Sequence, residues 1–83
     1  MRILYFAWLR ERMGHGEEEV EVPADVGTVG ELMRWLAARD EVSAHAFENP
    51  KVVRAAIDRR HVRPDAPLAG AAEIAFFPPM TGG

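Results

Sequence analysis

The distribution of apolar positions divides the first part of the chain into two short strands. Residues 3–9 (ILYFAWL) form a continuous apolar run, which is typical of a strand covered on both faces. In residues 17–22 (EEEVEV), Val20 and Val22 alternate with glutamates, which predicts a half-exposed strand that ends before Pro23. The two strands lie close in sequence, so we expect them to pair as a hairpin. Residues 10–14 then form a helical turn or loop between them, closed by a glycine.

One substantial helix is predicted to begin at Thr28 and to end at Arg39. Thr28 is followed three residues later by Glu31, a spacing typical of a capping box at a helix N-terminus. The apolar residues that follow recur at helical spacing and define one buried face, formed by Val29, Leu32, Met33 and Leu36. A second, shorter helix is expected over residues 43–48, before Pro50.

Three further strands are expected in the second half of the chain. Residues 52–57 (VVRAAI) predict one strand, a turn leads into a short strand around His61 and Val62, and residues 73–77 predict the last. The first and last strands are the most apolar, so we expect them side by side and parallel at the centre of a sheet. This order predicts an α+β domain, in which a mixed sheet packs on one main helix.

Composition and charge narrow the classes of function. The 83 residues are 48% hydrophobic and carry a net charge of −3, so we expect no nucleic-acid partner. No apolar run approaches the roughly 18–20 residues of a membrane span, so we expect a cytoplasmic protein with no membrane partner. The absence of cysteine excludes disulfides and thiolate metal sites. The three histidines lack metal-ligand spacing, and so small a domain can barely build a catalytic cleft; neither a metal site nor a self-contained enzyme is expected.

Two charged clusters have simple interpretations. The glutamates at positions 17, 18, 19 and 21 are expected to form a solvated strand edge that discourages edge-to-edge pairing. The basic cluster of Arg59, Arg60, His61 and Arg63 fits a solvated turn between strands. The alternative for this cluster is a patch that meets an acidic partner.

The last eight residues, FFPPMTGG, have a pattern that indicates a specific use. Ile74 and Phe76 share one face of the last strand, so Phe77 points to the other face. A large aromatic side chain there indicates either a partner-binding patch or a small second cluster, with Phe6 as its neighbour. Pro78 and Pro79 hold the chain extended. We therefore expect a domain over residues 1–78 and a flexible tail over residues 79–83.

The tail ends on one group with useful chemistry, the α-carboxylate of Gly83. Gly82 and Gly83 present only backbone, so they can enter a channel too narrow for any side chain. A carboxylate is a poor acyl donor and must first be activated, most simply as an acyl-adenylate made with ATP. A sulfur nucleophile can then displace AMP and leave a thiocarboxylate that donates its sulfur to an electrophilic carbon.

The sequence AFFPPMTGG at positions 75–83 resembles the tail of the small subunit of molybdopterin synthase, a family of ubiquitin-like sulfur carriers. The segment ILYFAWLRERMG from position 3 resembles the family's opening strand and turn, and PLAGAAEIAFFPP from Pro67 resembles its approach to the last strand. The resemblance runs the whole length of the chain and implies a β-grasp fold.

The resemblance also implies a function. A ubiquitin-activating-like adenylyltransferase would consume ATP to adenylate Gly83, which would become a thiocarboxylate. The tail would then enter the large subunit of molybdopterin synthase and supply sulfur to cyclic pyranopterin monophosphate. The chain would be a non-catalytic subunit of a heterotetramer and a sulfur-donating co-substrate, with no cofactor of its own.

The same resemblance implies roles for individual residues. Phe6 and Phe77 match positions of the family's docking face, and His61 stands where the family often has an apolar docking residue. Asp58 stands where Asn is common, so the turn there is expected to differ. The tail residues implied to thread the partner are Met80, Thr81 and Gly82.

Two alternatives remain open from the sequence. The first is a β-grasp sulfur carrier for another pathway, such as thiamine, cysteine or tRNA thiolation, which would share the fold and the terminal glycines. The second is a ubiquitin-like interaction module with an inert tail. The Phe-Phe-Pro-Pro stretch before the tip favours the molybdopterin pathway.

Overall fold

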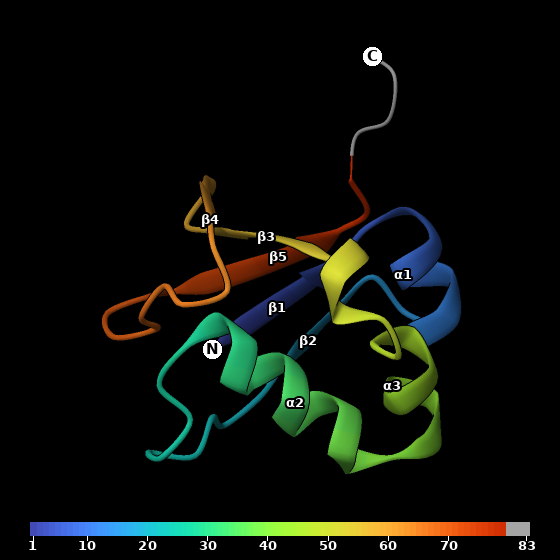
Figure 1. The fold of residues 1–83 in the computed structure, drawn as a ribbon, viewed down its shortest axis with the longest axis horizontal. Helices are drawn as coiled ribbons and strands as arrows, with labels where there is room; N and C mark the ends of the chain where they lie inside the picture. Colours follow the sequence, from blue (N-terminus) through green and yellow to red (C-terminus); the bar gives the residue numbers. More distant parts are fainter. Residues whose placement is uncertain (80–83) are drawn as a thin grey trace.

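The computed structural model describes residues 1–79, which form a five-stranded sheet with helices packed on one side (Figure 1). The strand order is β2-β1-β5-β3-β4; β1 and β5 are parallel and the other neighbours are antiparallel. The predicted mixed sheet is therefore confirmed. The elements in chain order are β1 (Arg2–Tyr5), α1 (Ala7–Met13), β2 (Glu17–Glu19), α2 (Val29–Arg39), α3 (Glu41–Ala46), a 3-10 turn (Pro50–Val52), β3 (Arg54–Ile57), β4 (Arg60–Val62) and β5 (Glu73–Phe77).

The two most apolar strands lie at the centre of the sheet, as predicted. Ile3 of β1 is in register with Ile74 of β5, and Tyr5 is in register with Phe76. All four side chains point to the helical side of the sheet and are almost completely buried. Since Ile74 and Phe76 of β5 face the helices, the alternate residues of β5 face the opposite side of the sheet.

Helix α2 covers this core and begins as the sequence predicts. The backbone N–H of Glu31 donates to the Thr28 hydroxyl oxygen at 3.2 Å, and the Glu31 carboxylate accepts from the Thr28 N–H at 3.1 Å. This reciprocal capping satisfies N–H groups that an α-helix leaves without partners. The predicted apolar face is buried against the sheet, through Val29, Leu32, Met33 and Leu36.

The first apolar run is not one strand, contrary to the prediction for residues 3–9. Strand β1 ends at Tyr5, and Ala7 adopts a left-handed conformation (φ 53°) that turns the chain into α1. Trp8 therefore lies on a helix, with the Arg12 guanidinium 4.6 Å from its ring centroid. Helix α1 ends at Gly14, whose φ of 83° is the left-handed cap expected of glycine.

Three other elements differ in their bounds from the prediction. Strand β2 ends at Glu19, although Val20 and Val22 still pack against the core. Helix α3 begins at Glu41 because Asp40 caps it, accepting from the Ser43 N–H at 2.7 Å. The start expected for β3 at residue 52 is wrong, because residues 50–52 form the 3-10 turn instead.

The glutamates of β2 were expected to form a solvated strand edge, but one of them, Glu18, is largely covered. Glu18 lies under α2, where its carboxylate accepts from both terminal nitrogens of Arg39 at 2.9 and 3.0 Å and from the Tyr5 hydroxyl at 2.7 Å. The hydrogen bonds from Arg39 lower the pKa of Glu18 to about 2. Burial and the neighbouring Glu18 raise the pKa of Tyr5 well above its usual range. This network joins β1, β2 and α2.

Residues 80–83 lie outside the described part of the chain. The expected tail over residues 79–83, and with it the boundary after residue 78, therefore stays a prediction. Among residues 1–79, none of the helices has the length and apolar character needed to cross a bilayer.

Candidate docking face

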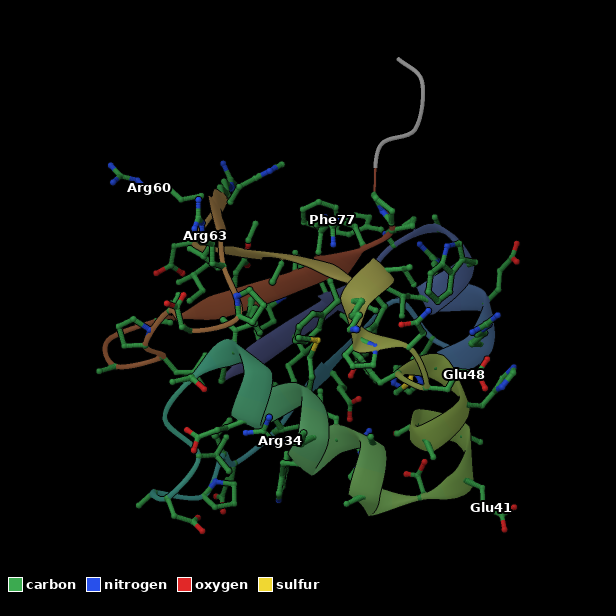
Figure 2. The ribbon with its side chains drawn as sticks, in the orientation of Figure 1. Arg34, Glu41, Glu48, Arg60, Arg63 and Phe77 are labelled. Carbon is green, nitrogen blue, oxygen red and sulfur yellow. The ribbon has the colours of Figure 1, made fainter. Side chains whose placement is uncertain are left out.

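The three partner-binding residues predicted within the described chain lie together. Phe6, His61 and Phe77 line one open hollow of about 610 Å³ on the face of the sheet opposite α2. Figure 2 shows Phe77 on that side. The Phe6 side chain is 48% exposed, and the ring centroids of His61 and Phe77 are 5.1 Å apart at an angle of 50°. The docking face is defined here as the apolar and aromatic residues that line this hollow: Leu4, Phe6, Ala56, His61, Ala75 and Phe77.

The sheet register explains why this face is hollow. Ala75 at the centre of β5 is paired with Leu4 on one side and with Ala56 on the other. Two of these three side chains are alanines, which project little from the sheet. The larger rings of Phe77 and Phe6 project further at the end of the sheet, so a hollow forms between them and the alanines. Because successive side chains alternate between faces, Ala75 and Phe77 must point outward once Ile74 and Phe76 point into the core.

Phe6 owes its position to the break between β1 and α1. Its N–H donates to the Phe76 carbonyl at 3.1 Å, which holds the backbone against β5. Its own carbonyl accepts from the Leu9 N–H at 3.1 Å, which starts α1. The left-handed Ala7 (φ 53°) that follows costs about 1 kcal/mol for a residue with a Cβ. Strain of this kind tends to occur near functional surfaces.

The turn between β3 and β4 places His61 at the other side of the hollow. Its two central residues, Asp58 and Arg59, both have positive φ (47° and 73°), as in the type I′ turns favoured in two-residue hairpins. The Asp58 carboxylate accepts from the backbone N–H groups of Ala72 and Glu73, at 3.2 and 3.0 Å. Asp58 thus fills the role expected of Asn in a left-handed position and also ties the turn to the start of β5.

The docking face is mainly apolar, with charged side chains around it. Its apolar residues are accompanied by three charged ones around the hollow, namely Arg2, Arg59 and Glu73. Among residues 1–79, no group of three or more His, Asp or Glu side chains is placed to hold a metal ion.

The remaining predicted site residues are Met80, Thr81, Gly82 and Gly83, and all four lie outside the described residues. The described chain leads toward them from the docking face, because β5 ends at Phe77 and passes directly into Pro78 and Pro79. The group expected to carry sulfur therefore follows the docking face in the sequence by six residues.

Sequence reasoning missed part of the face. Alternation along the first apolar run places Leu4, Phe6 and Trp8 on one face of a strand, but Trp8 lies on α1 instead. The two alanines give no signal of their own, because small residues are common in strands and turns alike. Ala56 could be found only from the pairing of β3 with β5, which single-sequence patterns do not specify.

Comparison with known proteins places the chain among carriers of similar length. The sequence pattern of the ThiS family matches residues 3–83. The chain is 41% identical over 83 residues to the molybdopterin synthase sulfur carrier subunit of Escherichia coli (strain K12), covering 100% of this chain and 99% of that protein. The protein of the same name from Haemophilus influenzae is 31% identical with the same coverage.

Solved structures agree on the fold. The putative molybdopterin converting factor, subunit 1, from Pyrococcus furiosus has a TM-score of 0.73 at 27% identity and covers 95% of each chain. SAMP1 from Haloferax volcanii has a TM-score of 0.72 at 24% identity, covering 100% of this chain and 98% of that one, and supports the fold alone. The chain therefore has the ubiquitin-like β-grasp fold and belongs to the ThiS family.

Proposed function

We propose that this chain is the sulfur-carrier subunit of a molybdopterin synthase. The observation that carries the proposal is its full-length identity of 41% with a protein of that name. An exposed apolar face just before the C-terminal Gly-Gly supports it, because a carrier must dock while its last residue enters another protein's site. The partner is then the large subunit of the synthase, and the tail residues after Pro79 reach into it.

The chemistry assigned to Gly83 proceeds in two steps before transfer. A carboxylate oxygen of Gly83 attacks the α-phosphorus of ATP within a ubiquitin-activating-like adenylyltransferase, which gives an acyl-adenylate and releases pyrophosphate. A sulfur nucleophile then attacks the acyl carbon, and AMP leaves. With hydrosulfide as the nucleophile, Gly83 is left with a thiocarboxylate directly. With a persulfide donor, a thiol must then reduce the S–S bond of the acyl disulfide, which frees the thiocarboxylate and leaves the donor as a disulfide.

Transfer takes place in the large subunit. The thiocarboxylate sulfur attacks an electrophilic carbon of cyclic pyranopterin monophosphate, and an oxygen substituent of that carbon leaves with its bonding electrons. Water then hydrolyses the resulting thioester, so the sulfur stays on the substrate and Gly83 regains its carboxylate. One carrier delivers one sulfur atom, so a dithiolene needs two deliveries. The chain itself contributes the docking face, the extended Pro78-Pro79 connection and the reactive carboxyl group, while the catalytic side chains belong to its partner.

The experiment supplies the chain with the activating enzyme, ATP and a sulfur donor, and follows its intact mass. We expect a gain of about 16 Da, from one oxygen replaced by sulfur. A chain that lacks Gly83 should stay at its starting mass, with its melting temperature as the control for folding. If the full-length chain never gains this mass while a known carrier does in the same mixture, the proposal is wrong and an interaction module is favoured.

A second assay separates the proposed pathway from related ones, which the match to the ThiS family keeps relevant. The loaded chain is mixed with the large subunit and cyclic pyranopterin monophosphate, and molybdopterin is measured. We expect stoichiometric sulfur transfer. A chain that loads but gives no molybdopterin with a competent large subunit would be a carrier for another pathway.

A further inference from the structure

Arginines of the β3–β4 turn stand beside the docking face. Arg59 lines the same hollow as His61 and Phe77, and Arg60, the first residue of β4, is exposed next to it. Arg60 pairs with Ile57, which packs against the core, so the Arg60 side chain points to the face of the sheet opposite the docking face. Figure 2 shows Arg34 on α2, on the side of the sheet away from Phe77. A partner that covers the docking face therefore meets Arg59 directly and comes near Arg60, the next residue in the chain.

The charges of these two arginines are not balanced within the described chain. Among residues 1–79, no carboxylate lies within 4.0 Å of the Arg59 or Arg60 guanidinium. Three arginines have such a partner, namely Arg2, Arg12 and Arg39, and the remaining ones in this range, like Arg34 on α2, have none. The adjacent acid, Asp58, is already engaged by backbone N–H groups at the start of β5. The turn thus presents positive charge to solvent.

This positive charge is unusual for the molecule. Residues 51–63 contain five of the ten Lys and Arg residues but only one of the thirteen Asp and Glu residues. The rest of the chain, with five basic and twelve acidic residues, is strongly negative. Charge is therefore segregated. Within the basic part, Arg59 lines the docking hollow, whereas Lys51, Arg54 and Arg63 line a separate hollow beside α2.

We propose that the surface which covers the docking face carries a carboxylate opposite Arg59, and that this pairing, with the nearby Arg60 adding to the local positive charge, steers the encounter of the two proteins. The inference rests on the proposed function, because it assumes that this surface belongs to the large subunit of molybdopterin synthase. Complementary charge at the rim of an apolar contact raises the association rate and fixes the orientation more than it adds affinity. An apolar hollow beside the arginines, on a chain of net charge −3, favours a protein over a nucleic acid.

The test measures the association rate constant of the chain with the large subunit by stopped flow at low and high salt. We expect Arg59→Glu to slow association about 3–10-fold at low ionic strength, with Arg59→Gln intermediate and Arg60→Glu, whose side chain points away from the docking face, smaller in its effect. The difference should vanish near 1 M salt, where the Debye length is about 3 Å. Arg34→Glu is the matched control, because it reverses one exposed arginine on the opposite side, and it should stay within about twofold of the native rate.

Each outcome bears on the inference. If Arg59→Glu and Arg34→Glu slow association equally, or if neither slows it, the inference is overturned. The proposed function then still stands, provided that the native chain binds the large subunit. Failure of the folded native chain to bind the large subunit overturns both. Binding of a labelled single-stranded RNA that depends on Arg59, without any change in the association rate, assigns the turn to nucleic acid and also overturns the inference.

Discussion

Replacing Glu18 with glutamine removes one charge from the network that joins β2 to α2. In the native chain, the Glu18 carboxylate accepts two hydrogen bonds from Arg39 and one from the Tyr5 hydroxyl. These bonds favour the ionised form and lower the pKa of Glu18 from 4.5 to about 2. Glutamine is similar in size but cannot hold the same pairing, so the variant tests what the charge contributes.

The magnitude follows from the pKa difference. A fall from 4.5 to about 2 corresponds to an upper limit of about 3.4 kcal/mol at 1.36 kcal/mol per unit. The Glu18 and Arg39 side chains are 20% and 28% exposed, so solvent screening reduces this to about 1.5–2 kcal/mol. Because the folded-state pKa is the lower one, this stabilisation is complete above about pH 4.5 and is lost as the pH falls toward 2.

Urea denaturation at pH 7 and pH 3 measures the free energy of unfolding. Urea is uncharged, so it does not screen the Glu18–Arg39 ion pair as a salt would. We expect Glu18→Gln to lower the free energy of unfolding by about 1.5–2 kcal/mol at pH 7 and by clearly less at pH 3. Glu19→Gln on the same strand is the control, because its side chain is 77% exposed and it should change stability by less than about 0.5 kcal/mol. A Glu18→Gln variant as stable as the native chain at pH 7, or equally destabilised at both pH values, would refute the reasoning.

Three further substitutions test the geometry around the docking face. Ala7→Gly should raise the free energy of unfolding by about 0.5–1 kcal/mol, because glycine adopts the left-handed φ without strain; a clear loss in urea denaturation would contradict this. Asp58→Ala should cost about 1–3 kcal/mol through the lost hydrogen bonds, whereas Asp58→Asn keeps an acceptor and should cost less; equal costs would mean that the carboxylate bonds are unimportant. Phe77→Arg should weaken large-subunit binding by at least about 2 kcal/mol in calorimetry, while Val42→Arg, at an exposed apolar position on α3, should not. Unchanged affinity would remove Phe77 from the interface.

The sequence predicted best those features whose signal is local. The spacing of Thr28 and Glu31 marked the start of α2, and alternation along β5 placed Phe77 on the face opposite Phe76. Both depend on residues within five positions of each other. The parallel pairing of β1 with β5 was also predictable, since two apolar runs without alternation both need cover on two sides.

Features that depend on distant contacts were not predictable in the same way. The apolar run at the N-terminus gave no sign of the left-handed break at Ala7, because a buried strand and a buried helix can share the same apolar composition. Glu18 looked like its neighbours in a run of acids, and only α2 brings Arg39 to it, 21 positions later. The floor of the docking face required the register between three strands, which small residues do not encode.

Intact-mass spectrometry of the chain isolated from its own host decides whether Gly83 carries sulfur in the cell. The sample is best taken from cells that lack the large subunit, in which a loaded carrier has no acceptor and should accumulate. We expect a species about 16 Da heavier than the unmodified chain, with fragmentation placing the added mass on Gly83. Finding only the unmodified carboxylate in such cells would contradict the proposed role as a sulfur carrier.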